Sequence, residues 1–140
     1  MEQLPKFVLP VSVRFSDTDA NRHVFFANYL TYFDMALMAY LKEVGYSFDR
    51  LLQNGFNLYY VEALTRFKGS AYFDEVLDVY AEISRFGTTS FTGNFIIYEN
   101  KTQRLVNSGY LAAVIVDVKN EKPTPIPLDF KNAVEAFENR

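Results

Sequence analysis

The stretch NYLTYFDMALMAYLKEV, residues 28–44, decides how the rest of this sequence is interpreted. Apart from Glu43 near its end, its few polar residues form only a thin stripe on a helical wheel: Asn28, Thr31, Asp34 and Lys42. A helix that is apolar nearly all round is buried on most of its sides. We therefore predict a long, buried helix that ends at Gly45, because glycine readily adopts the left-handed conformation of a helix C-cap.

Strand patterns lie on both sides of this helix. Before it, Val11, Val13 and Phe15 alternate with polar residues, which is the period of a half-buried strand. Four longer runs rich in apolar and β-branched residues follow it, over residues 56–69, 76–84, 90–98 and 104–118. The segments RFGTT and ENKTQ between them are typical of hairpin turns. We expect these four strands to follow one another in a meander.

Two shorter helices complete the predicted elements. Ser47 is suited to cap a helix over residues 48–54, which Gly55 would end. The segment of residues 123–140 is predicted to be a proline-rich arm followed by a short helix. Together the elements indicate a single α+β domain over residues 1–140, in which a curved antiparallel sheet wraps around the long helix.

Composition excludes several classes of function. The chain has 140 residues, 49% of them hydrophobic, and no cysteine, so disulfides and thiolate catalysis are excluded and a reducing cytoplasm is expected. No apolar run is long enough for a signal peptide or a membrane span. A net charge of −3 argues against nucleic acid as a partner, because phosphate binding requires clustered lysine and arginine.

The segment RFSDTDANRHVFFANYLTYFD, residues 14–34, places carboxylates and the chain's single histidine directly before the buried helix. Asp17 and Asp19 are also common turn residues, since aspartate bonds its own backbone. A calcium loop is excluded, because its sixth position needs glycine and holds Arg22, and its twelfth needs glutamate and holds Asn28. Two interpretations of this segment, a catalytic site and a simple turn, therefore remain open.

This segment and the predicted architecture resemble the hotdog-fold thioesterases of the 4-hydroxybenzoyl-CoA thioesterase and acyl-CoA thioesterase type. In that family a strand ends in a D-T-D segment, and the central helix begins N-Y-L-x-Y-[FW]-[DE]. Residues 17–19 and 28–34 match these motifs. Residues 67–99 resemble the downstream strands and hairpin of the family, so the resemblance extends over residues 11–118.

The resemblance implies roles for particular residues. Asp19 matches the catalytic carboxylate of the family, and Asn21 and His23 match the D-x-N-x-H arrangement of its acyl-ACP thioesterase branch. Phe26 falls where a main-chain N–H polarises the thioester carbonyl. Thr89 and Ser90 lie in the hairpin that contacts the pantetheine or phosphates of coenzyme A.

The sequence also departs from the family. Arg22 occupies a position that is usually glycine, which indicates a different loop backbone. Phe26 occupies the position of a histidine that one bacterial branch uses. The further catalytic candidates of the plant acyl-ACP enzymes include a cysteine, which this chain lacks.

The resemblance therefore implies an acyl-thioester hydrolase that acts on acyl-CoA or acyl-ACP without a metal or a redox cofactor. Asp19 would act as general base or nucleophile, and the start of the helix would stabilise the oxyanion. Family members form dimers or tetramers with sites at the interface, and residues 105–118 are apolar on both faces, so we expect a homo-oligomer. The alternatives are a hotdog hydratase or dehydratase and a non-catalytic acyl-CoA or small-ligand binding module.

Overall fold

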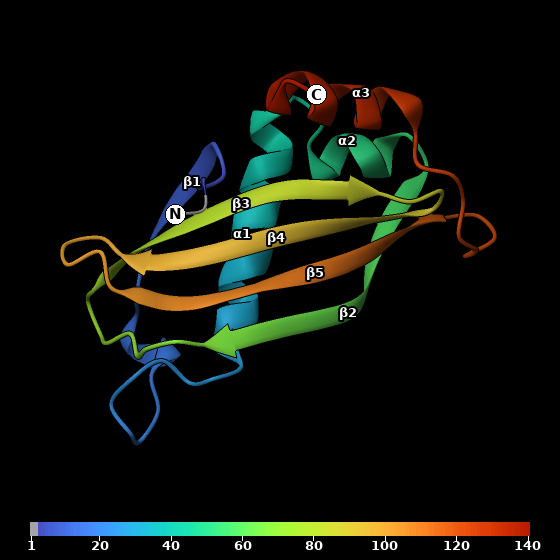
Figure 1. The fold of residues 1–140 in the computed structure, drawn as a ribbon. Helices are drawn as coiled ribbons and strands as arrows, with labels where there is room; N and C mark the ends of the chain where they lie inside the picture. Colours follow the sequence, from blue (N-terminus) through green and yellow to red (C-terminus); the bar gives the residue numbers. More distant parts are fainter. Residues whose placement is uncertain (1–2) are drawn as a thin grey trace.

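The structure, a computed structural model, describes residues 3–140 as a sheet of five antiparallel strands packed against a long helix (Figure 1). The helices are α1 (Asn28–Glu43), α2 (Phe48–Gln53) and α3 (Leu128–Glu138), with a short 3₁₀ turn, η1 (Phe15–Asp17). The strands are β1 (Phe7–Ser12), β2 (Phe56–Phe67), β3 (Val76–Phe86), β4 (Ser90–Glu99) and β5 (Leu105–Asp117). The predicted α+β architecture with a central helix is confirmed.

The strand order in the sheet is β1-β3-β4-β5-β2. The meander prediction is therefore correct for β3, β4 and β5 and wrong for β2, which pairs with β5 at the edge of the sheet. The connection from β2 to β3 passes the loop before α1, where the Val24 N–H donates to the Ala71 carbonyl at 2.8 Å. The segment before α1 is thus held against the β2–β3 connection.

The first strand differs from its prediction. It ends at Ser12, and Phe15 belongs to η1 with its side chain 75% exposed. The alternation of Val11, Val13 and Phe15 was misleading because the Asp17 N–H donates to the Arg14 carbonyl at 2.9 Å, which turns the chain out of the sheet. Val13 is still buried, so only Phe15 breaks the pattern.

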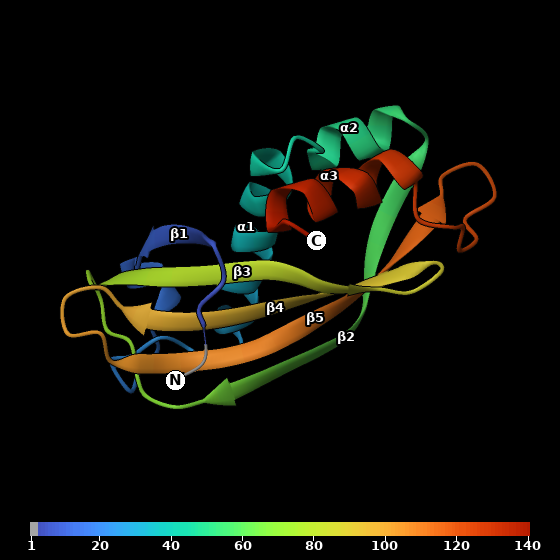
Figure 2. The ribbon, with the colours of Figure 1, turned by 45° about the horizontal axis from the view of Figure 1, so that its top comes forward.

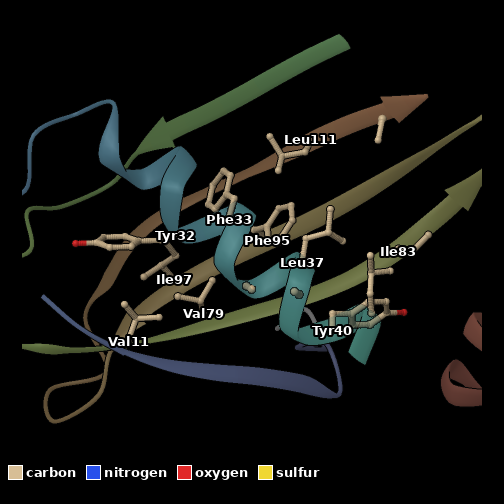
Figure 3. Close-up of a cluster of buried hydrophobic side chains, with 14 of the residues drawn as sticks. Val11, Tyr32, Phe33, Leu37, Tyr40, Val79, Ile83, Phe95, Ile97 and Leu111 are labelled. Carbon is tan, nitrogen blue, oxygen red and sulfur yellow. The ribbon is translucent and has the colours of Figure 1, made fainter. Parts of the chain in front are cut away.

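The core lies between α1 and the inner face of the sheet (Figure 3). The ring of Phe33 on α1 stacks on that of Phe95 on β4, with centroids 4.6 Å apart. Gly109 on β5 makes room for this pair, since a Cβ there would overlap the Leu64 carbonyl and lie 3.0 Å from the Phe33 ring. The close approach of β2, β5 and α1 therefore depends on glycine at position 109.

The ends of the helices agree with the sequence. Gly45 follows α1 with φ of +88°, the left-handed conformation predicted for it. The Ser47 Oγ accepts the Arg50 N–H at 3.1 Å and caps α2. Figure 2 shows α3 beside α2 at the far end of α1, where the ring of Phe130 stacks on Tyr46 at 5.2 Å.

Candidate active site

Residues 18–24, which connect η1 to the start of α1, form a small hairpin. Thr18 pairs with Val24, the Asp19 N–H donates to the His23 carbonyl at 3.1 Å, and the Arg22 N–H donates to the Asp19 carbonyl at 2.9 Å. Arg22 has φ of +68°, as expected of the last residue of a three-residue hairpin loop. Although Arg22 replaces the usual glycine of the family, the backbone here adopts a conformation that glycine favours.

The half-buried carboxylate of Asp19 lies at the base of this hairpin. Its Oδ1 accepts the main-chain N–H of Asn21 at 2.8 Å, a contact typical of an aspartate in a turn. Its Oδ2 accepts no hydrogen bond from residues 3–140. One oxygen is therefore fixed in orientation while the other remains available to a water molecule or a substrate.

The structure brings Asn21 and His23 into the same hairpin as Asp19. Asn21 holds the carboxylate through its main-chain N–H, and its side chain is exposed. The half-buried imidazole of His23 has its Nδ1 3.1 Å from the Val24 carbonyl oxygen, and within the described part of the chain it makes no hydrogen bond to Asp19. If the proton is on Nδ1, this contact leaves the other ring nitrogen as an acceptor.

Phe26 lies immediately before α1. Its main-chain N–H donates to no acceptor in residues 3–140, and no side chain caps the helix at Ala27. The start of a helix concentrates such N–H groups and about half a positive charge. This site is therefore suited to stabilise the negative charge that develops on a carbonyl oxygen.

Exposed aromatic side chains surround the start of α1. The ring of Phe26 is 61% exposed and lies 4.8 Å from that of Phe25 and 6.3 Å from that of Phe67 at the end of β2. Phe15 and Phe73 add a second exposed pair with centroids 5.8 Å apart. Apolar groups gathered in this way mark a surface that binds a ligand or another protein.

Thr89 and Ser90 lie far from this group of residues within one chain. They belong to the hairpin between β3 and β4, where the Thr89 carbonyl accepts the Ile115 N–H at 2.8 Å. In Figure 1 that hairpin and the loop before α1 are at opposite ends of the sheet. A single chain therefore does not bring Thr89 and Ser90 together with Asp19.

Asp17 is the residue whose importance the sequence analysis missed. Its side chain is buried, and its Oδ2 accepts the Arg14 N–H at 2.9 Å and the Tyr32 hydroxyl at 3.0 Å. Burial raises the pKa of Asp17, but the hydrogen bonds from Arg14 and Tyr32 outweigh it and leave the pKa below its usual value. The sequence signals were the first aspartate of the D-T-D match and an arginine three residues before it.

Two further observations apply to residues 3–140. Their helices include none with the length and hydropathy of a membrane span. They also contain no group of three His, Cys, Asp or Glu side chains placed to hold a metal ion.

A hollow of about 860 Å³ lies on the outer face of the sheet, away from α1. Its lining includes Asn94, Ile96 and Tyr110, whose strand neighbours Phe95 and Gly109 face the core. None of the residues expected in the site contributes to it.

With the fold and the loop geometry established, the chain can be compared with known proteins. Residues 13–134 match the model of the thioesterase-like superfamily. The chain belongs to this superfamily. An acyl-CoA thioesterase of Haemophilus influenzae, YbgC, is 28% identical over 131 residues, which are 91% of this chain and 93% of that protein. A putative esterase of Aquifex aeolicus is 25% identical over 93 residues, 66% of this chain and 73% of that protein.

Solved structures of coenzyme A thioesterases have the same fold. A gentisyl-coenzyme A thioesterase superposes with a TM-score of 0.82 at 26% identity, covering 91% of this chain and 99% of its own. A 1,4-dihydroxy-2-naphthoyl-CoA thioesterase from Synechocystis superposes with a TM-score of 0.84 at 22% identity, covering 91% and 94%. The predicted resemblance to hotdog acyl thioesterases is confirmed.

Proposed function

We propose that this chain hydrolyses acyl-CoA thioesters, with Asp19 as the general base or nucleophile. The observation that carries the proposal is the half-buried carboxylate on the loop that leads into the start of α1, with one oxygen that accepts no hydrogen bond from residues 3–140. The superfamily and the acyl-CoA thioesterases of similar sequence and structure support the same reaction.

The reaction requires a base and an electrophilic group, and the loop supplies candidates for both. The Asp19 carboxylate accepts a proton from water or attacks the acyl carbon itself. The Phe26 N–H, together with the dipole of α1, stabilises the oxyanion as the carbonyl becomes tetrahedral. Asn21 orients Asp19 through its main-chain N–H, and His23, with its proton on Nδ1, orients the attacking water through the other ring nitrogen.

We further propose that the functional unit is a homodimer joined through β2. This strand is an edge of the sheet, is twelve residues long, and exposes Tyr59, Val61 and Phe67. A long apolar edge is a template for pairing with another strand. The opposite edge, β1, has six residues and contains Pro10, which cannot donate to a partner strand.

An antiparallel β2 pair also accounts for Thr89 and Ser90. The β3–β4 hairpin and the start of β2 lie at the same end of the sheet. Antiparallel pairing therefore places Thr89 and Ser90 of the partner subunit at the end where β2 reaches Phe67 and Phe26. Three strand spacings, about 14 Å, then separate the end of β2 in one subunit from the β3–β4 hairpin of the other. That distance suits a substrate whose thioester is at Asp19 and whose pantetheine or phosphates reach the partner's hairpin.

A second candidate function is a binding module that holds acyl-CoA without turnover. The hydrogen bond from the Asn21 N–H to the Asp19 carboxylate favours the binding module, because the needs of the turn alone would account for an aspartate at position 19. The two candidates differ in whether thiol is released and in whether Asp19 is needed.

The experiment is a thiol-release assay with short, medium, long and aromatic acyl-CoAs and with acyl-ACP. It compares the wild type with Asp19→Ala and with Asp49→Ala, an exposed control on α2. We expect turnover by the wild type and the control and loss of turnover in Asp19→Ala. Binding of acyl-CoA with no thiol release from any substrate would instead establish the binding module.

A further inference from the structure

Asp17 is a buried carboxylate that has no part in the chemistry proposed above. Its residue is 4% exposed, whereas Asp19, two positions later, is half-buried. Removing a carboxylate from water is costly unless it is paired and hydrogen-bonded. The contacts of Asp17 therefore indicate what its burial achieves.

The side chain of Asp17 joins the chain before it to helix α1. Its Oδ1 pairs with the Arg14 guanidinium at 2.9 Å, and its Oδ2 accepts the Arg14 main-chain N–H at 2.9 Å. The same Oδ2 accepts the hydroxyl of Tyr32, which lies one turn inside α1 and is 1% exposed. In Figure 3 the Tyr32 hydroxyl points away from the Phe33 side of the core.

The main-chain carbonyl of Asp17 adds contacts to the residue after the hairpin and to the start of α1. Its carbonyl oxygen accepts the Phe25 N–H at 2.9 Å and the Asn28 side-chain Nδ2 at 2.9 Å. Phe25 and Asn28 lie on either side of Phe26, whose N–H donates to no acceptor among the residues that the structure describes. Asp17, which directly precedes the hairpin that carries Asp19, thus bonds to the residue that directly follows this hairpin, and it contacts residues on either side of the candidate oxyanion donor.

We propose that Asp17 is a positioning residue for the hydrolysis, holding the Asp19 carboxylate in register with the Phe26 N–H. The inference rests on the proposed function. A displacement of about 1 Å between reacting groups costs on the order of 100-fold in rate. Among the described residues the carboxylate of Asp19 accepts a single hydrogen bond, from the Asn21 N–H of the same hairpin, so its placement relative to α1 depends on the base of the hairpin.

The same contacts would also stabilise the fold, and the two roles differ in what a substitution changes. If Asp17 is purely structural, its substitution lowers the melting temperature and leaves kcat unchanged for the protein that remains folded. If Asp17 positions Asp19, its substitution lowers kcat at temperatures where the variant is fully folded and leaves KM nearly unchanged. The same substitution has no further effect on kcat in a variant that already lacks the Asp19 carboxylate.

The test measures kcat and KM for Asp17→Asn, Asp19→Asn, the double variant and Tyr32→Phe, well below each melting temperature. Asparagine has the shape of aspartate but cannot pair with the Arg14 guanidinium as an anion. We expect Asp17→Asn to lower kcat about 10- to 100-fold with KM within about threefold. Tyr32→Phe removes one of the contacts, so we expect a smaller loss. The double variant should match Asp19→Asn.

The outcomes separate this inference from the proposed function. A wild-type kcat in Asp17→Asn would overturn the positioning role, and so would an equal fractional loss of kcat on adding Asp17→Asn to the wild type and to Asp19→Asn. In either case a loss of turnover in Asp19→Asn would still support the proposed function. If Asp17→Asn does not fold, Tyr32→Phe decides, and an unchanged kcat there overturns the inference. No turnover by the wild type would remove the proposed function and this inference with it.

Discussion

At the scale of single residues, Asp17 and Asp19 have opposite surroundings although only Thr18 separates them. Asp17 is buried with partners on both oxygens, whereas Asp19 is half-buried and has one oxygen without a partner in the described part of the chain. The sequence predicted Asp19, Asn21 and Phe26 as one loop, and the structure places them so. It did not predict that Asn21 contacts Asp19 through the main chain, because side-chain patterns carry no information about backbone hydrogen bonds.

The left-handed conformation of Arg22 gives a first prediction. For a residue with a Cβ, the left-handed conformation costs about 1–2 kcal/mol of free energy. Glycine avoids this cost, but its larger loss of conformational entropy on folding costs about 0.5–1 kcal/mol. Arg22→Gly should therefore leave the free energy of unfolding unchanged or raise it by up to about 1 kcal/mol. Arg22→Val should lower it by more than about 1 kcal/mol, because β-branched residues rarely adopt positive φ. Urea unfolding measures both, and equal values for the two variants would contradict the loop geometry.

Glu99 gives a prediction on acid stability. Main-chain N–H groups of Thr102 at 2.7 Å and Lys101 at 3.1 Å lower the pKa of Glu99 to about 2. Because the folded pKa lies below the unfolded one, the unfolded chain binds the proton first as the pH falls. The stability that Glu99 contributes above about pH 4 should thus be lost between about pH 4 and pH 2.

The measurement compares urea midpoints at pH 7 and pH 3 for the wild type and Glu99→Gln. The variant should be less stable at pH 7 and should lose less stability on going to pH 3. A wild type and a variant with parallel pH dependence would show that Glu99 does not titrate in this way.

At the scale of elements, the long helix was predictable and the neighbours of β2 were not. The helix prediction succeeded because the apolar wheel of α1 reflects burial by a sheet around it, and Tyr32, Phe33 and Leu37 are indeed buried. Apolar alternation identifies a strand but contains no information about which strand lies beside it. The position of β2 at an edge depends instead on long-range pairing with β5.

Gly109 gives a prediction about that pairing. Its added Cβ would meet the Leu64 carbonyl of β2 and the Phe33 ring, so Gly109→Ala should lower the free energy of unfolding by about 1–3 kcal/mol or more. Gly93→Ala on β4 is the matched control, since its Cβ would meet only the Phe95 ring within 3.4 Å, at 3.3 Å. The control should lose clearly less stability in thermal or urea unfolding. Equal losses would show that the β2–β5 approach is not as close as described.

At the scale of the whole molecule, one chain does not bring together all the residues proposed for the site. Aromatic side chains around Phe26 are exposed, and the Thr89–Ser90 hairpin is at the other end of the sheet. Both features have one explanation if two β2 edges pair. The sequence predicted an oligomer from the family resemblance, yet the choice of β2 over β1 required the sheet order.

Val61 tests this arrangement. It is 63% exposed on β2, so Val61→Glu should place like charges at the interface, give a monomer in sedimentation at micromolar concentration, and lower the rate of hydrolysis. Val8→Glu on β1, where Val8 is 38% exposed, should leave both the mass and the rate unchanged. A fully active Val61→Glu monomer would exclude a site that needs two chains.

The measurement that tests the central claim most directly is kcat/KM of Asp19→Asn relative to the wild type, on the best acyl-CoA substrate and at equal oligomer concentration. Asparagine keeps the shape of the side chain and its contact with the Asn21 N–H but cannot accept a proton or attack as a carboxylate. We predict a loss of about 100- to 10,000-fold, the contribution of a positioned base. A value within about threefold of the wild type would mean that Asp19 only closes a turn and that another group performs the hydrolysis.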